Sequence, residues 1–234
     1  MTEITTELQS LLDNLRVDKL GIVSLDSCKD TEVYTTAREL LPGANSVIIL
    51  AMELFPELVK YLTSEKKVGE LVLRDLFNRN ADIANGQLDW ESYRLVKDLH
   101  RLGYKGVPLP AGDAPFDSRF IEGMLDYKQA AVMAGMGMFG WNTLLLTPEF
   151  GARVRLSCIV TDARLDGTSS DHDFNPCLRC GGACVKVCPV HALKPPVDSE
   201  SFNIDKFLCN NYLTATGGCS ECLRVCPADR LSGQ

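Results

Sequence analysis

Eight of the chain's ten cysteines lie between residues 177 and 226, in two runs that each end in Cys-Pro. The first run reads C-x2-C-x3-C-x3-C-P, and the second reads C-x2-C-x3-C-P after a separate Cys209. A cubane iron–sulfur cluster is held by four thiolates, and in two-cluster ferredoxins the cysteine before proline binds the other cluster. The pattern therefore predicts two 4Fe–4S clusters with crossed ligands. The first set is Cys177, Cys180, Cys184 and Cys226, and the second is Cys188, Cys209, Cys219 and Cys222.

Two other kinds of cysteine site explain this pattern less well. A zinc ribbon uses two C-x2-C pairs and has no need of the additional Cys-Pro ligands. A disulfide framework requires an oxidising compartment, and no apolar signal segment follows Met1. One irregularity concerns cluster type, because three residues rather than the usual two separate Cys180 from Cys184. Two of the three are glycines, which reach positive φ freely and can still present Cys184.

Composition limits the remaining possibilities. With 234 residues, 45% of them hydrophobic, the chain can bury a core, and it is expected to divide into domains at 1–165 and 166–234. A net charge of −7 argues against a nucleic-acid partner held through phosphate contacts. No run approaches the roughly 18 uncharged apolar residues of a membrane span. We therefore expect a cytoplasmic protein without a membrane span and without a nucleic-acid partner.

Hydrophobic periodicity predicts an α/β domain followed by a small ferredoxin-like domain. Leucines at helical spacing begin near Leu8, and the apolar run 46–52 is typical of a central strand covered on both faces. Further helices are expected at 31–41, 68–77, 88–102 and 127–134, further strands at 21–25 and 104–109, and a hairpin of 143–147 with 152–161. Residues 165–176 are polar and rich in turn formers, which favours a domain boundary there.

A second distinctive stretch, residues 134–151, reads A-G-M-G-M-F-G-W-N-T-L-L-L-T-P-E-F-G. Its glycines suit close approach of the backbone to a large flat ligand, or equally a tight helix–hairpin packing. The stretch resembles A-G-L-G-x-x-G-K-N-T-L-L-x-x-P-E-F-G of the epoxyqueuosine reductases and reductive dehalogenases. Residues 207–227 similarly resemble that superfamily's C-x-x-Y-L-T … G-C-x-x-C-x-x-x-C-P. The resemblance extends in order over roughly residues 20–228.

The resemblance implies a corrinoid-binding domain of nitroreductase-like α+β fold, followed by two 4Fe–4S clusters. The segment that it implies for corrinoid binding contains Gly135, Gly137, Met138, Phe139, Gly140, Trp141, Asn142 and Thr143. The superfamily's Gly-Lys is Gly140-Trp141 here, and neither Asp117 nor Asp126 lies in the motif of the catalytic aspartate. A reductive reaction needs a proton donor. The candidates are Tyr104, Tyr127 and Lys128.

Three functions are consistent with these features. The first is a corrinoid-dependent iron–sulfur oxidoreductase with a small-molecule or corrinoid substrate, supplied with electrons by reduced ferredoxin or flavodoxin. The second is an electron-transfer or corrinoid-handling protein that has no small-molecule substrate of its own. The third is an iron–sulfur reductase that binds a flavin in place of the corrinoid. The loss of the Gly-Lys pair favours the second function, and the large N-terminal domain favours the first.

Overall fold

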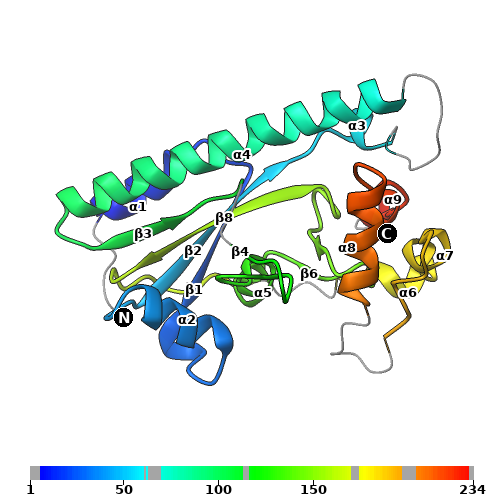
Figure 1. Ribbon diagram of the computed structural model, residues 1–234. Helices are drawn as coiled ribbons and strands as arrows, with labels where there is room; N and C mark the ends of the chain where they lie inside the picture. The colour runs from blue at the N-terminus through cyan, green and yellow to red at the C-terminus, as the bar shows by residue number, and fades with distance from the viewer. Residues whose placement is uncertain are drawn as a thin grey trace. The chain divides into compact units, whose positions relative to one another are not determined.

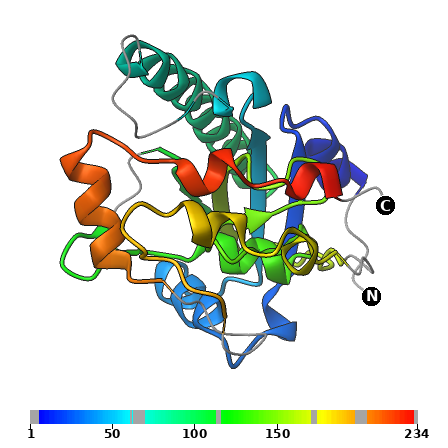
Figure 2. The same cartoon turned by 90° about the vertical axis from the view of Figure 1, so that its right-hand side faces the viewer.

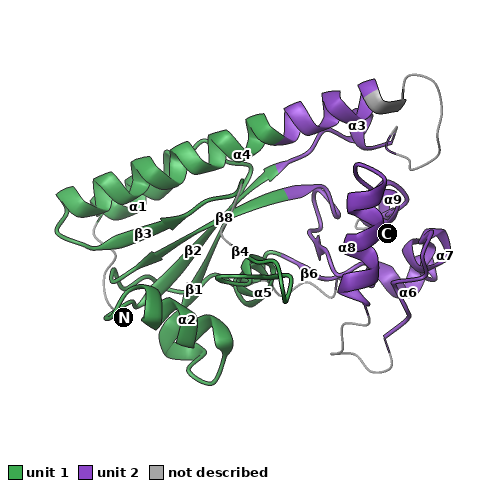
Figure 3. Ribbon diagram, viewed as in Figure 1, with its two compact units in different colours: residues 1–52, 82–136, 155–171 green, residues 53–81, 137–154, 172–234 purple. Residues whose placement is uncertain are grey.

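The computed structural model describes residues 6–60, 62, 70–112, 116–169, 174–196 and 204–231. The chain forms two compact units, each assembled from three stretches of sequence (Figure 3). The first unit contains 1–52, 82–136 and 155–171, and the second contains the intervening segments 53–81, 137–154 and 172–234. The predicted domains at 1–165 and 166–234 divide the chain in sequence order, and this division stays a prediction.

A four-stranded sheet in the order β1-β2-β8-β3 forms the frame of the first unit (Figure 1). Its strands are β1 (Lys19–Ser24), β2 (Ser46–Glu53), β3 (Gly106–Leu109) and β8 (Val154–Thr161). β1 pairs antiparallel with β2, with Ile22 opposite Ile48, and β3 pairs antiparallel with β8. β2 is buried from Ser46 to Ala51. This burial confirms the expectation, drawn from its near-continuous apolar run, of a central strand covered on both faces.

Helices cover both faces of this sheet (Figures 1 and 2). They are α1 (Thr6–Asp13), α2 (Glu32–Leu40), α4 (Glu70–Arg101) and α5 (Tyr127–Met133). On one face, Leu88 and Leu95 of α4 pack with Ile48 and Leu50 of β2 in a single hydrophobic cluster. α2 and α5 lie on the other face, where α5 contacts β1. The mixed α/β class expected from the sequence is confirmed.

The helix α4 runs through a stretch where the sequence predicts two separate helices. It is continuous from Glu70 to Arg101 and includes Gly86. A glycine inside a helix costs about 1 kcal/mol relative to alanine. Burial of Ala81, Ala84 and Leu88 along one side of the helix outweighs that cost. The sequence shows the local propensity, whereas the packed face decides the length of the helix.

The expected hairpin of 143–147 with 152–161 is found only at its turn. Thr147 and Gly151 form an antiparallel bridge there. The preceding strand β7 (Leu145–Leu146) pairs instead with β6 (Met138–Phe139), and β8 joins the four-stranded sheet. The glycines before and after β6 explain this partner, because Gly137 and Gly140 both lie against Leu146 with no room for a side chain.

The remaining elements are short. They are the 3-10 helix Leu25–Ser27, α3 (Pro56–Val59), β4 (Phe116–Asp117), β5 (Glu122–Gly123), α6 (Pro176–Cys180), α7 (Ala183–Val187), α8 (Lys206–Ala215), α9 (Glu221–Arg224) and α10 (Ala228–Leu231). Among the helices that the structure describes, none combines the length and the hydropathy needed to cross a membrane.

Two glycines of the first unit are expected to respond oppositely to alanine. A Cβ on Gly21 would lie 2.6 Å from Met136 Cγ and 2.8 Å from Ala134 Cβ. We expect Gly21→Ala to lower the free energy of unfolding by about 1–3 kcal/mol through overpacking. At Gly86, nothing lies within 4 Å of the added Cβ. Gly86→Ala should therefore raise stability by about 0.5–1 kcal/mol.

Denaturant unfolding of both variants of the full chain, in parallel with the unsubstituted chain, measures the two effects. An unchanged midpoint for Gly21→Ala would show that β1 and the segment after α5 separate easily and do not form a tightly packed contact.

Candidate functional site

The first cysteine run forms α6 and α7, joined by two glycines with left-handed backbone. Gly181 and Gly182 have φ angles of 63° and 75°, which glycine adopts without the penalty that a Cβ imposes. A Cβ on Gly182 would also lie 2.9 Å from Cζ3 of Trp141. The additional residue between Cys180 and Cys184 is thus accommodated by a turn that requires glycine.

Burial and neighbouring thiols from both runs raise the pKa values of Cys177, Cys184 and Cys226. The pKa of Cys184 is raised to about 11, by burial first and then by the neighbouring thiols of Cys177 and Cys226, with a smaller contribution from Cys180. Burial is also the main cause that raises the pKa of Cys226 to about 11, and Cys177 and Cys180 add to it. Cys226, from the second run, therefore lies among the first three cysteines of the first run.

The other four thiols form a second group in the same way. The pKa of Cys222 is raised to about 12, by burial and then by Cys219 and Cys209, with further contributions from Cys184 and Cys188. The pKa of Cys209 is raised by burial, then by Cys188 and Cys219. Cys188, from the first run, thus lies among cysteines of the second run. Over the ranges that the structure describes, no three His, Cys, Asp or Glu side chains are close enough together to hold a single metal ion.

Backbone N–H groups point at several of these sulfurs. The N–H of Ala192 donates to Cys188 Sγ at 3.3 Å. Further backbone N–H donors lower the pKa of three thiols of the first group, partly opposing the effect of burial: Trp141 to Cys177, Val185 to Cys184, and Ala228 to Cys226. Such donors favour the thiolate, the form in which cysteine binds a metal.

Trp141 packs against the hydrophobic residues around both thiol groups. It contacts the cluster that contains Cys177 and Cys226, and also the cluster that contains Cys184, Cys188, Cys209 and Cys222. Next to it, the Asn142 amide donates to the carbonyl of Cys222 at 3.4 Å. The resemblance assigned these two residues to corrinoid binding, and in the structure both contact the cysteine segment.

The glycines of the predicted corrinoid-binding segment are in close contact with their own chain. A Cβ on Gly137 would lie 2.0 Å from the carbonyl oxygen of Leu146, and one on Gly140 would lie 2.4 Å from Asn142 Oδ1. These contacts show tight packing of both glycines within the β6–β7 hairpin. A bulky substitution at Gly137 would disrupt the β6–β7 pairing, and the assignment of this pair to corrinoid binding stays a prediction.

Among the other predicted residues of this segment, Thr143 lies in the hydrogen-bonded turn between β6 and β7 and has an unusual backbone conformation. Thr143 has φ +60°, a left-handed conformation that is a genuine outlier for a β-branched side chain. Strain of this kind persists only where the surroundings enforce it, and it is concentrated at ligand-binding sites. Met138 and Phe139 are partly buried in β6, and Gly135, with φ +68°, belongs to the first unit.

The three proton-donor candidates all belong to the first unit. Tyr104 packs against the main hydrophobic core. The hydroxyl of Tyr127 donates to the carbonyl of Pro110 at 3.0 Å, and burial followed by the fields of Cys158 and Asp89 raises the pKa of Tyr127 well above its ordinary value. Lys128 lies in the first turn of α5 and is partly buried. Tyr127 thus stays protonated at every physiological pH.

An ion-paired arginine of the second unit gave no signal in the sequence. Arg153 donates to Asp229 Oδ2 at 2.7 Å and to Glu53 Oε1 at 2.8 Å. Burial lowers the pKa of Arg153, but the two carboxylates raise it by more. Asp229 lies three residues after Cys226, a cysteine of the first thiol group. The two ion pairs therefore join the chain next to this cysteine to the end of β2 and the start of β8. Arg153 directly precedes β8 and is 9% exposed, and the structure, rather than the sequence pattern, shows its partners.

The chain was compared with protein-family models and with curated proteins. No protein-family model matches the chain. An epoxyqueuosine reductase of Bacillus cereus is 30% identical over 223 residues, which is 86% of this chain and 52% of the relative. A tetrachloroethene reductive dehalogenase of Desulfitobacterium hafniense is 26% identical over 205 residues, which is 80% of this chain and 33% of the relative.

The chain is a homologue of the epoxyqueuosine reductases and reductive dehalogenases. The resemblance inferred from the cysteine runs and the glycine stretch is thereby confirmed. The chain spans about half the length of the first of these curated relatives.

Solved structures of both families share the fold. A reductive dehalogenase, whose structure suggests a mechanism for B12-dependent dehalogenation, superposes with a TM-score of 0.70 at 16% identity, over 96% of this chain and 32% of that one. An epoxyqueuosine reductase with an epoxyqueuosine-modified tRNA-Tyr stem loop gives a TM-score of 0.55 at 20% identity, over 96% of this chain and 64% of that one.

The second of these structures corrects one expectation. Net negative charge led us to expect no nucleic-acid partner, yet a solved epoxyqueuosine reductase is seen with a tRNA stem loop. The expectation that a chain of this kind has no nucleic-acid partner was therefore wrong. Net charge is a sum over the whole chain and does not determine the potential at a particular surface.

Crossed ligation predicts that Cys188→Ser, although it lies in the first cysteine run, affects the cluster held by the second run. We expect this substitution to damage the cluster of Cys209, Cys219 and Cys222, because Cys188 lies within their electrostatic reach. Electron paramagnetic resonance of the reduced, reconstituted variant should therefore match the spectrum of Cys209→Ser and differ from that of Cys180→Ser.

Cys28→Ser serves as the control, because this thiol lies outside both runs and should leave both signals intact. A Cys188→Ser spectrum that matches Cys180→Ser would refute the crossing.

Substitution of the buried, ion-paired Arg153 should lower the stability of the chain far more than substitution of the exposed Arg79. Arg153→Met leaves Glu53 and Asp229 without their shared cation. We expect the free energy of unfolding to fall by about 2 kcal/mol. This is less than the full cost of breaking a buried pair, because both carboxylates are partly exposed. The matched control is Arg79→Met, whose 3.8 Å pair with Asp75 is exposed on both sides and should contribute about 0.5 kcal/mol or less. Equal shifts of the two unfolding midpoints would contradict a stabilising role for the Arg153 pairs.

Proposed function

We propose that the chain is an iron–sulfur oxidoreductase that holds two 4Fe–4S clusters in a ferredoxin-like cysteine segment and passes electrons to a corrinoid. The observation that carries the proposal is the exchange of Cys226 and Cys188 between the two electrostatically coupled thiol groups. That exchange is the ligand pattern of two-cluster ferredoxins. A zinc site or a set of disulfides has no requirement for it.

The residues around the thiols have defined tasks in this proposal. Burial keeps water away from the clusters, and the N–H groups of Val185, Ala192 and Ala228 stabilise negative charge on sulfur. Hydrogen bonds to the sulfurs and exclusion of solvent are among the factors that set cluster reduction potentials. Trp141, which packs against both groups, excludes solvent on the side of the β6–β7 hairpin. Iron must displace the protons that the raised pKa values retain on these thiols.

The homologues support a corrinoid as the electron acceptor, since a dehalogenase of the same fold is described as B12-dependent. When bound, a corrinoid supplies a low-valent metal that reduces an organic substrate. The strained Thr143 and the adjacent Asn142 are the residues of the 137–143 segment that we assign to its surroundings. Tyr127 is our choice of proton-holding residue, because the hydrogen bond from its hydroxyl to the carbonyl of Pro110 at 3.0 Å fixes the position of that hydroxyl.

The names of both homologous families denote reduction of an organic substrate, and we propose the same reaction class for this chain. The match covers 52% of the epoxyqueuosine reductase and 33% of the dehalogenase, so the substrates of these relatives are not transferred to this chain. A second candidate, an electron-transfer or corrinoid-handling protein, is favoured by one observation. Trp141 replaces the lysine of the superfamily motif and packs among the cysteines.

Anaerobic reconstitution tests the cluster part of the proposal. We expect about eight irons and eight sulfides per chain, as two cubane clusters require. About four irons together with bound zinc would contradict the two-cluster assignment, and about seven irons would indicate a three-iron cluster in the group that contains Cys184.

Titration of the reconstituted chain with cobalamin under reducing, anaerobic conditions tests the corrinoid part. The expected result is a shift of the visible spectrum to the base-off form, with oxidation of the pre-reduced clusters as cobalt is reduced. The same titration with flavin mononucleotide is the comparison. Binding of flavin without any cobalamin shift would replace the corrinoid by a flavin and leave the cluster assignment unaffected.

A further inference from the structure

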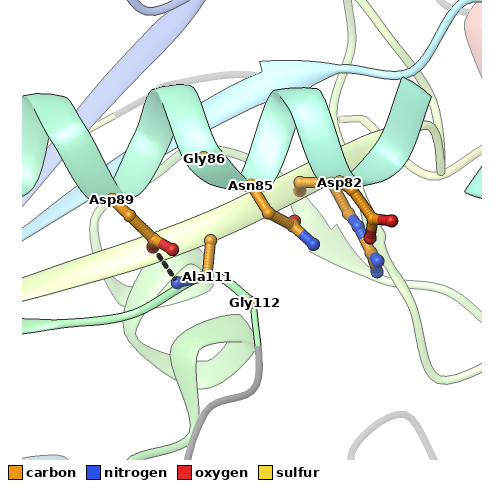
Figure 4. A pocket seen from close by; sticks show the side chains of 7 residues that line it. Asp82, Asn85, Gly86, Asp89, Ala111 and Gly112 are labelled. Atoms are coloured by element: carbon orange, nitrogen blue, oxygen red, sulfur yellow. Dashed lines mark hydrogen bonds between the residues drawn. The ribbon is translucent and has the colours of Figure 1, made fainter. Parts of the chain in front are cut away.

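The first unit contains a polar pocket that includes neither thiol group nor the 137–143 segment. It has a volume of about 380 Å³ and lies between α4 and the chain that follows β3 (Figure 4). Its lining residues are Asp82, Asn85, Gly86, Asp89, Ala111, Gly112 and Arg155. Four of them carry charged or amide side chains, an unusual concentration for a cavity beside a hydrophobic core.

Asn85 is the decisive residue of this pocket. Its side chain is 7% exposed, and its Oδ1 atom is buried with no hydrogen-bond partner among the described residues. A buried amide oxygen without a partner costs about 1–3 kcal/mol. Gly112 lies against the same amide, because a Cβ there would be 3.3 Å from Asn85 Nδ2. The glycine thus leaves room for an amide that points into the pocket (Figure 4).

The pocket is also rich in hydrogen-bond acceptors. Asp82, Asn85 and Asp89 follow one another at intervals of three and four residues and lie on one side of α4 (Figure 4). Asp89 accepts a hydrogen bond from the N–H of Ala111 at 2.6 Å through one carboxylate oxygen. Two carboxylates and one guanidinium line the pocket, which leaves an excess of one negative charge.

Arg155 does not turn the pocket into an anion site. Partial removal from water lowers the pKa of Arg155, and the field of Asp82 opposes that effect. The guanidinium thus lies in the field of one carboxylate, and the second carboxylate, that of Asp89, leaves the pocket with a net negative charge. A negatively charged ligand would meet that carboxylate, whereas a positively charged ligand would complement it.

We propose that this pocket binds a small organic cation, a primary or secondary amine with adjacent hydroxyl groups. The ammonium group donates a hydrogen bond to Asp89. Rotation of the Asn85 amide, one helical turn away, turns its buried Oδ1 into the pocket, where it accepts a second hydrogen bond from the same group. The hydroxyl groups reach Asp82 and Arg155 at the other end of the pocket. The inference does not depend on iron, on a corrinoid or on the proposed reductase activity.

Three small molecules of equal length provide the test. 3-Amino-1,2-propanediol carries the proposed cation, glycerol is its neutral counterpart, and glycerate is the anionic one. Isothermal titration calorimetry of the full chain should show the amine binding at least about tenfold more tightly than the other two, as expected for a charged hydrogen bond. Tighter binding of glycerate, or equal binding of amine and glycerol, would overturn the proposal.

Two substitutions connect that binding to this pocket. Asn85→Ala removes the unpartnered oxygen, and Asp89→Asn removes the charge while keeping an oxygen for the N–H of Ala111. Each should weaken binding of the amine at least about fivefold. The control is Asp75→Asn on the same helix, an exposed carboxylate paired with Arg79. An amine affinity that is unchanged in Asp89→Asn, or lowered equally in Asp75→Asn, would show that the pocket is not the site.

Discussion

The burial of cysteine thiols close to one another is the constraint on which the second unit depends. Cys222, Cys226 and Cys184 all have raised pKa values because water is excluded and neighbouring thiols oppose further negative charge. Grouped ligands of this kind become favourable once a metal centre takes up their charge. The short helices α6, α7, α9 and α10 contain few residues each and are held together mainly through these cysteines, Trp141 and the Arg153 ion pairs.

The first unit is stabilised in a different way. Its sheet and the helix α4 share one large apolar cluster, which needs no ligand for its stability. Within this unit, Asn85 Oδ1 is one of three buried side-chain atoms, with Nε of Arg38 and of Arg94, that have no hydrogen-bond partner among the described residues. Asn85 differs from the two arginines because it lines a polar pocket, and this is why we infer a ligand there.

Homology and local physics bear on different questions in this protein. The relatives establish the ancestry of the chain and the fold of the solved homologues. They do not account for Trp141, which replaces a lysine of the superfamily motif and contacts the residues around both thiol groups. A homologous reductase is seen with a tRNA stem loop, so the net charge of this chain does not by itself exclude a nucleic-acid partner.

The sequence by itself determined the two cysteine runs and the mixed α/β class, because ligand spacing and hydrophobic period are local properties of the chain. The crossed assignment of the cysteines is its prediction. It also identified the need for glycine at Gly181 and Gly182, which the left-handed backbone there bears out. Only the tertiary structure decided that α4 is continuous, that β7 pairs with β6, and that Arg153 joins Glu53 to Asp229. The continuity of α4 and the Arg153 ion pairs depend on contacts with residues far apart in the chain. The β6–β7 pairing depends on the space left by Gly137 and Gly140 against Leu146, which only the packed structure shows.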